Sequence, residues 1–305
     1  MFDVISIGAA TADIFIKSDS FYRSSRFISV KRSAKNEISE SLICSGGGAT
    51  NSATTFSRLG LKSAIVSLIG SDPLSQYIKK DLATEKIISL LAEKKHETTD
   101  YSVILVANDG SRSILTNRGS SRLENKHIPW SKLKTKWLYL TSLEGNLDLL
   151  EKIIGFAREN EIKVSFNPGS RELSCRRQLL PLLKYLDFLL LNRFEAETLV
   201  DIDHKNSEFW EKLRKCAPLV AVTNGRLGAK ILTPVDTYYS PIINTHPLDE
   251  TGAGDAFGSA FVAALIYNHS LPEALSWGIK NSASVVSALG AKKGILSFKK
   301  NSHVT

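Results

Sequence analysis

Residues 249–257 read DETGAGDAF and carry the clearest chemical signal in the chain. Gly252, Ala253 and Gly254 allow close backbone approach and can point successive N–H groups at one anion. Residues 256–267 are apolar and rich in small side chains, so we expect a buried helix whose N-terminus adds partial positive charge. Asp255 stands where that helix begins. It can simply cap the helix, or it can take a proton from a hydroxyl that attacks a phosphoryl group.

The composition around this stretch is that of a globular α/β protein. The chain has 305 residues, with 43% hydrophobic and 23% charged residues, which excludes disordered, fibrous and coiled-coil classes. Its apolar runs are shorter than a membrane span requires. The N-terminus has no basic segment of a secretory signal, and the cysteines Cys44, Cys175 and Cys216 are dispersed. We therefore expect a cytoplasmic protein without a membrane partner.

The net charge is +8, and the pI is near 9.3. Lysine and arginine are spread along the chain without an accompanying series of aromatic residues. This distribution favours solvated surfaces with a general attraction for anions, and we expect no nucleic acid partner.

Apolar runs alternate with amphipathic helices from residue 136 onward. We expect strands at 137–140, 163–166, 188–191 and 219–222, with helices such as 147–159 and 207–214 between them. This order predicts a mainly parallel sheet with helices on both faces.

The first half of the chain gives a different pattern. Residues 13–43 indicate short exposed strands, and 101–106 with 113–116 indicate a β-hairpin around 108–110. We expect one buried strand at 63–69, a helix beginning at Asp72-Pro73, and a longer amphipathic stretch at 87–96. The exposed strands would form a small sheet that projects from a single domain, residues 1–305.

The motif D-x-T-G-A-G-D-x-F resembles the C-terminal signature of the ribokinase-like (PfkB) carbohydrate kinases. P-loop and protein-kinase motifs are absent from the sequence. The resemblance implies a three-layer α/β/α sandwich of the ribokinase-like fold, with a mainly parallel central sheet and a small β-sheet lid. The lid strands would come from about 13–43 and 99–118.

Two further motifs resemble the acceptor site of that family. Gly46, Gly47 and Asn51 match its GG-x-x-x-N element, and Asp13 matches an aspartate that binds paired hydroxyls. A carboxylate accepts two O–H groups, and an amide both donates and accepts, so both suit a polyhydroxylated acceptor. Taken alone, these residues could equally form a glycine-rich turn and a solvated loop.

The nucleotide side resembles the family at a third set of positions. The corresponding residues are Asn192, Thr223, Gly225, Gly228, Thr251 and Asn281. Glu195 completes an N-x-x-E motif that implies Mg²⁺ held through water, although a glutamate three residues after Asn192 also suits a capping box. Asp249 matches the region where many members bind a monovalent cation, so K⁺ is an additional expectation.

The implied activity is transfer of the γ-phosphoryl group of ATP to a hydroxyl of a sugar or sugar-like acceptor. Asp255 would be the general base, and the amides of 252–254 would form the anion hole. Two alternatives stay open: a nucleoside kinase on the same fold, and an inactive sugar- or nucleotide-binding regulator. The family also implies a homodimer through the lid. Residues 18–35 and 87–96 depart from the pattern of the family, and these differences leave the acceptor unidentified.

Overall fold

The computed structural model describes the chain except residues 25–26, 109–110, 120–121, 246 and 299–305. Its main feature is a large sheet with the strand order β17-β16-β15-β14-β13-β12-β1-β6-β8. The strands are β1 (Phe2–Ile7), β6 (Ser63–Val66), β8 (Ile88–Ser89), β12 (Thr135–Leu140), β13 (Lys163–Phe166), β14 (Phe188–Asn192), β15 (Val220–Thr223), β16 (Ala229–Leu232) and β17 (Thr237–Ser240). All pairs from β8 to β15 are parallel, and β16 and β17 add antiparallel strands at one edge. The expected mainly parallel sheet is confirmed.

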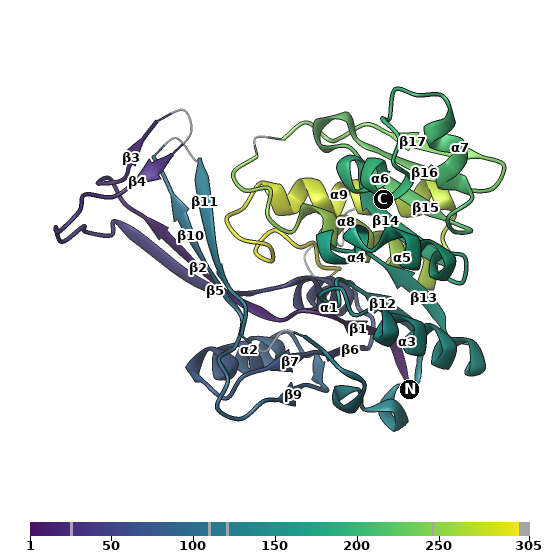
Figure 1. Ribbon diagram of the computed structural model, residues 1–305, viewed down its shortest axis with the longest axis horizontal. Helices are drawn as coiled ribbons and strands as arrows, with labels where there is room; N and C mark the ends of the chain where they lie inside the picture. Colours follow the sequence, from purple (N-terminus) through teal and green to yellow (C-terminus); the bar gives the residue numbers. More distant parts are fainter. Residues whose placement is uncertain (25–26, 109–110, 120–121, 246, 299–305) are drawn as a thin grey trace.

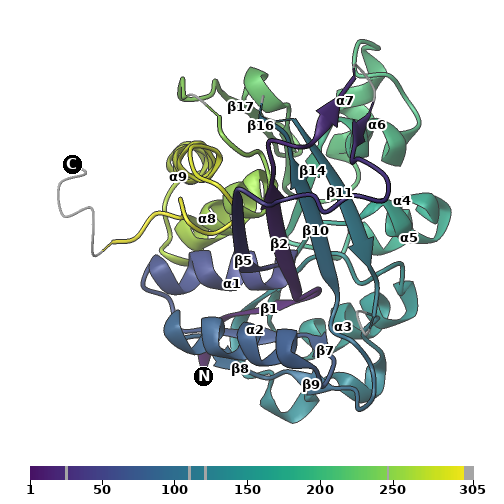
Figure 2. The same ribbon diagram turned by 90° about the vertical axis from the view of Figure 1, so that its left-hand side faces the viewer.

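Helices cover both faces of this sheet (Figures 1 and 2). They are α1 (Gly48–Arg58), α2 (Pro73–Thr84), α3 (Leu147–Glu159), α4 (Ser170–Ser174), α5 (Arg176–Leu183), α6 (Arg193–Val200), α7 (Glu208–Arg214), α8 (Ala253–Ile266) and α9 (Leu271–Val286). Short 3₁₀ turns lie at Asn125–His127, Trp130–Lys132 and Gly225–Leu227.

The alternation of side chains along each strand explains the three layers. In β12, Trp137 and Tyr139 pack with α1, α8 and α9, whereas Leu138 and Leu140 pack with α3 and α5. Because successive side chains of a strand point to opposite faces, a strand that is apolar throughout must be covered on both. The continuous apolar runs of the sequence therefore become the middle layer of the sandwich.

A second sheet, β11-β10-β2-β5, projects from the sandwich as the lid (Figure 1). Its strands are β2 (Thr11–Lys17), β5 (Glu40–Gly46), β10 (Tyr101–Val106) and β11 (Arg112–Asn117), with the small pair β3 (Tyr22–Arg23) and β4 (Ile28–Ser29) beyond them. The β10–β11 hairpin is confirmed, while residues 109–110 of its expected turn lie outside the described residues.

Several local predictions need correction. The expected strand 63–69 is two strands, β6 and β7 (Leu68–Ile69), because β7 leaves the large sheet and pairs with β9 (Ala92–Glu93). The stretch 87–96 contains β8 and β9, since pairing with β6 and β7 overrides its amphipathic pattern. Helix α2 begins as expected, with Asp72 Oδ1 accepting from Ser75 N at 2.9 Å.

Helix α8 begins at Ala253, earlier than the expected residue 256. Gly252 occupies the cap position, so Asp255 lies in the first turn and its side chain does not cap the helix. None of the helices in the described parts combines the length and apolar character that crossing a bilayer requires.

Candidate active site

Asp255 occupies the first turn of α8 and faces α1. Its Oδ2 accepts a hydrogen bond from Asn51 Nδ2 at 2.9 Å. Burial raises the pKa of Asp255, and the Asn51 hydrogen bond only partly opposes that shift. The ionised carboxylate therefore has little compensation, which makes it a better proton acceptor than an ordinary aspartate.

The loop before Asp255 exposes backbone N–H groups. Gly252 has φ 77, and a Cβ built on it would lie 2.5 Å from Cβ of Ala291, so this position requires glycine. A Cβ built on Gly254 would have nothing within 4 Å, since this residue borders open space. Among the described residues, the amides of Gly252, Gly254 and Asp255 have no backbone acceptor. These N–H groups and the helix dipole are suited to an anion.

Asp13 lies in β2 at the base of the lid and is buried. Burial raises the pKa of Asp13, and the charge of Asp255 also raises it. Hydrogen bonds from Ser102 and Thr11 and the charge of Lys292 lower it. The effect of the Asp255 charge on the Asp13 pKa indicates that the two carboxylates lie near each other. Gly46 is opposite Thr11 in the neighbouring strand, and a Cβ built on it would be 2.0 Å from Asp13 Oδ2.

Three buried polar atoms near these carboxylates have no hydrogen-bond partner in the described part of the chain. They are Asn51 Oδ1, Thr141 Oγ1 and Tyr139 OH. Thr141 follows β12 and contacts the backbone at Gly8 and Gly48, and the charge of Asp255 raises the pKa of Tyr139, which burial already raises. Buried polar atoms are normally paired, so this cluster is suited to a ligand with several hydroxyl groups.

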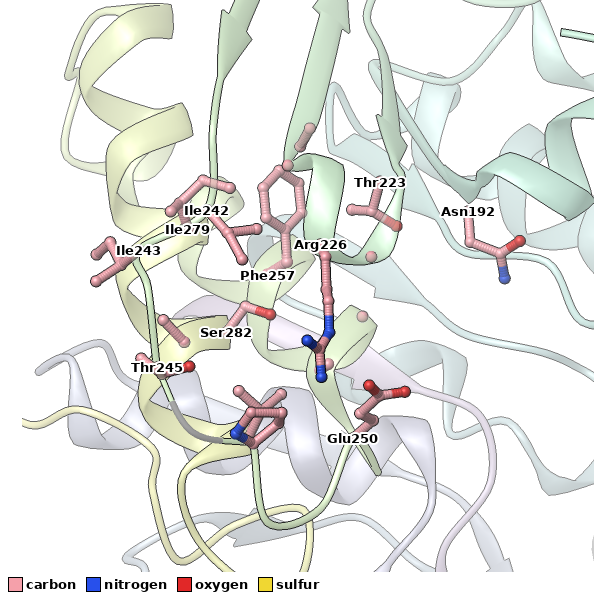
Figure 3. A pocket seen from close by; sticks show the side chains of 18 of the residues that line it. Asn192, Thr223, Arg226, Ile242, Ile243, Thr245, Glu250, Phe257, Ile279 and Ser282 are labelled. Carbon is pink, nitrogen blue, oxygen red and sulfur yellow. The ribbon is translucent and has the colours of Figure 1, made fainter.

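A cavity of about 440 Å³ lies on the other side of the loop (Figure 3). It brings together six residues expected on the nucleotide side or in the anion hole: Asn192, Thr223, Gly225, Gly228, Ala253 and Gly254. Ile242, Ile243 and Ile279 form an apolar wall at one end, while Arg226 and Glu250 lie nearer the loop. Apolar walls with a few polar groups are typical of cofactor-sized sites.

Asn192 and Glu195 form a reciprocal capping box at the start of α6. Asn192 Oδ1 accepts from Glu195 N at 3.0 Å, and Glu195 Oε2 accepts from Asn192 N at 2.8 Å. One carboxylate oxygen of Glu195, Oε2, therefore takes part in the capping box, as one of the two interpretations of the motif predicts. Its Oε1 has no partner among the described residues, and burial raises the Glu195 pKa with a contribution from the charge of Asp255. A free carboxylate oxygen beside the cavity fits Mg²⁺ held through water.

Asp249 is buried, and donors already surround its carboxylate. Oδ1 accepts from Thr251 N at 2.9 Å and Thr251 Oγ1 at 2.6 Å, and Oδ2 accepts from Gly290 N at 2.9 Å. The guanidinium of Arg112, from the lid, makes an ion pair with Oδ1. A carboxylate offers about four acceptor positions, so these residues do not fit an additional K⁺ ion.

The comparisons with known proteins decide the family. Residues 1–297 match the model of the pfkB family carbohydrate kinases. The chain belongs to this family. It is 28% identical to the ribokinase of Haemophilus influenzae over 262 residues, which cover 83% of this chain and 84% of that protein.

This pfkB kinase is also similar to a nucleoside kinase and to a solved structure with bound ATP. The nucleoside kinase of Methanocaldococcus jannaschii is 26% identical, with 84% of this chain and 83% of that protein covered. A structure from E. coli in complex with ATP and Mg²⁺ has a TM-score of 0.84 at 19% identity, covering 98% of this chain and 97% of that one. The ribokinase-like fold expected from the sequence is confirmed.

Two residues expected on the nucleotide side of this pfkB kinase, Thr251 and Asn281, do not line the cavity, and Thr251 N and Oγ1 donate to Asp249 instead. The side chain of Asn281 is buried: Nδ2 donates to Ala256 O at 2.8 Å, and Oδ1 accepts from Leu296 N at 2.9 Å. It therefore ties α9 to α8 and does not line the large cavity. Ile279 and Ser282, on the same helix, do line it.

Some residues that complete the site lie outside the sequence motifs. Thr141 follows a parallel strand at its carboxyl end, the edge where such sheets bind ligands, so its position could have suggested it. Ile242 and Ile243 lie in a segment without a recognisable pattern, and only the tertiary fold brings them to the cavity.

Proposed function

We propose that this pfkB kinase transfers the γ-phosphoryl group of ATP to a hydroxyl of a sugar or sugar-like acceptor, with Asp255 as general base. The observation that carries this proposal is the environment of Asp255. Its carboxylate lies at a helix N-terminus, has a raised pKa and, among the described residues, accepts a single side-chain hydrogen bond, from Asn51. Asn51 also carries an unpaired Oδ1, and Gly254, beside Asp255 in the chain, lines the large cavity.

The acceptor would lie between the lid and α1. Asp13 would accept hydrogen bonds from two neighbouring hydroxyls, while Asn51 Oδ1 and Thr141 Oγ1 would pair with others. Gly46 and Gly47 would let the backbone approach the ligand, since side chains there would strike Asp13 and Ala9. This arrangement selects a polyhydroxylated molecule without specifying which one.

In the reaction, the attacking hydroxyl gives its proton to Asp255 as its oxygen bonds to the γ-phosphorus. The bond from that phosphorus to the bridging oxygen breaks, and ADP leaves. Charge on the transferred group would meet the free amides of Gly252 and Gly254 and the N-terminus of α8, since the Ala253 amide donates to Glu250 O. Catalysis is then mainly positioning and electrostatic stabilisation.

The nucleotide would occupy the large cavity. Its base would lie against Ile242, Ile243 and Ile279, and its phosphates would run past Thr223 and Gly228 toward Gly254. Asn192 and Glu195 would hold Mg²⁺ through water. When bound, that ion would offset the negative charge of the phosphates.

A coupled ADP-release assay over pentoses, hexoses, their phosphates and nucleosides tests the proposal. We expect turnover with at least one polyhydroxylated acceptor, and a turnover rate lower by about 10² or more for Asp255→Asn. The nucleoside kinase alternative is supported by the M. jannaschii relative; it would hold if kcat/KM for nucleosides exceeds that for every free sugar. Binding of ATP and sugar without any transfer would favour the regulator.

A further inference from the structure

Arg112 links the lid to the loop that precedes the anion hole. It is the first residue of β11, and its guanidinium makes an ion pair with Oδ1 of Asp249. The Asp249 side chain is only 1% exposed, and that of Arg112 is 28% exposed. No other lysine or arginine makes an ion pair with Asp249 in the described part of the chain. A buried carboxylate without a counter-charge is strongly unfavourable, so Arg112 is its charge partner.

The other contacts of Asp249 show what this charge stabilises. The carboxylate accepts from both N and Oγ1 of Thr251 and from Gly290 N. Thr251 directly precedes Gly252, and Gly252 packs against Ala291, the neighbour of Gly290. Through these hydrogen bonds, Asp249 connects the loop 249–252 to the segment after α9 and orients the backbone amides that follow it. Its position depends on the charge that Arg112 supplies.

The same sheet carries Arg112 and the acceptor aspartate. Val106 of β10 is paired with Arg112 of β11 on one side and with Lys17 of β2 on the other. Asp13 lies on the same strand β2, four residues before Lys17. The position of the lid that brings Asp13 to the acceptor therefore also brings Arg112 to Asp249.

We propose that Arg112 is a positioning residue which supplies, from the lid, the positive charge that holds Asp249 and the loop 249–252, in place of a monovalent metal ion. This inference rests on the proposed kinase function. It makes phosphoryl transfer independent of K⁺ and makes the anion hole depend on the position of the lid. Arg112 does not line the cavity proposed for the nucleotide, and it acts through Asp249.

The kinetic test compares Arg112→Ala and Arg112→Lys with the unaltered enzyme, in KCl and in tetramethylammonium chloride at equal ionic strength. We expect the unaltered enzyme to be equally active in both salts. Arg112→Ala should lose about tenfold or more in kcat without K⁺ and recover most of it in KCl, as expected for an electrostatic contribution to the loop. Arg112→Lys should keep intermediate activity and stay insensitive to K⁺. Lys17→Ala is the control, because it removes an exposed lid ion pair with Glu40.

A second readout is independent of turnover. Thermal denaturation of Arg112→Ala should show a K⁺-specific rise of about 2 °C that the unaltered protein and Lys17→Ala lack, because an ion that binds the folded state stabilises it. Equal K⁺ activation of the unaltered enzyme and Arg112→Ala, or no response of Arg112→Ala to K⁺ in either readout, would overturn the inference. If no acceptor is phosphorylated, the kinase proposal fails, and the denaturation experiment still decides whether Arg112 replaces the ion.

Discussion

Asp249 and Asp255 stand at the two ends of one loop, and their carboxylates have opposite surroundings. Asp249 accepts from Thr251 twice, from Gly290 and from Arg112. Asp255 accepts a side-chain hydrogen bond from Asn51 alone among the described residues, and its pKa is raised. A carboxylate whose acceptor positions are filled fixes the structure around it, whereas one that is buried and poorly compensated stays available for proton transfer.

Asp13 is intermediate between these two. Hydrogen bonds from Thr11 and Ser102 and the charge of Lys292 favour its ionised form, although burial still raises its pKa. The sequence shows three aspartates in loops or strand ends, and only their partners separate the tasks of holding the loop, binding the acceptor and accepting the proton.

The largest effect should come from Asp255→Asn. The amide keeps the shape of the side chain and cannot take the proton, so kcat should fall by about 10² or more. Steady-state kinetics would measure this loss, and calorimetric titration should find the ATP Kd within about threefold of the unaltered value. Near-full kcat in this variant would remove Asp255 from the role of base.

The same substitution should stabilise the fold. Because the pKa of Asp255 is raised, the folded state binds its proton more tightly than the unfolded chain does. The ionised carboxylate therefore lowers stability at pH values above the folded pKa, and this cost disappears as the pH falls through it. At neutral pH, Asp255→Asn should melt about 2 °C higher; a clearly lower Tm would contradict this account of its surroundings.

The next largest effect should come from Asp13→Ala, which removes a binding group and leaves the base in place. The acceptor KM should rise by about tenfold to a hundredfold, the size expected for lost hydrogen bonds to a charged group. The KM for ATP should stay the same. An unchanged acceptor KM would show that Asp13 does not bind the acceptor.

Two glycines of the loop form a matched pair for a smaller effect. Gly254→Ala places a methyl group in open space, so the fold should be preserved while the cavity is narrowed. We expect the KM for ATP to rise about tenfold with an unchanged or slightly higher Tm, since alanine favours helices over glycine. Gly252→Ala should lower the Tm for two reasons: a φ of 77 is unfavourable for alanine, and Ala291 leaves no space for a side chain. Equal Tm losses in both would refute the distinction.

The smallest effect should be a displacement of the pH profile in Asn51→Leu. The Asn51 hydrogen bond lowers the pKa of Asp255 against the effect of burial. Its removal should raise that pKa, so the acid limb of kcat should move to higher pH. Stopped assays across the pH range, at saturating acceptor, measure the displacement; a move to lower pH would contradict the stated direction.

The sequence predicted the sandwich better than the surroundings of the site. Runs such as 188–191 are apolar on both faces and can only be central strands, and the order of motifs placed Asp13, Asn51 and Asp255 at one site. Arg112 and Ile242 could not be identified, because neither lies in a motif and each reaches the site through tertiary packing. The side chain of Asn281 contacts α8 and does not line the large cavity, because helical position alone does not determine which face of α9 borders that cavity.

The pH dependence of kcat, recorded for the unaltered enzyme and for Asp255→Asn, tests the central claim most directly. The unaltered enzyme should lose activity tenfold per pH unit below a pKa above that of an ordinary aspartate, because protonated Asp255 cannot accept the hydroxyl proton. The small residual rate of Asp255→Asn should lack this acid limb. If both proteins show the same acid limb, another group takes the proton, and Asp255 is not the base.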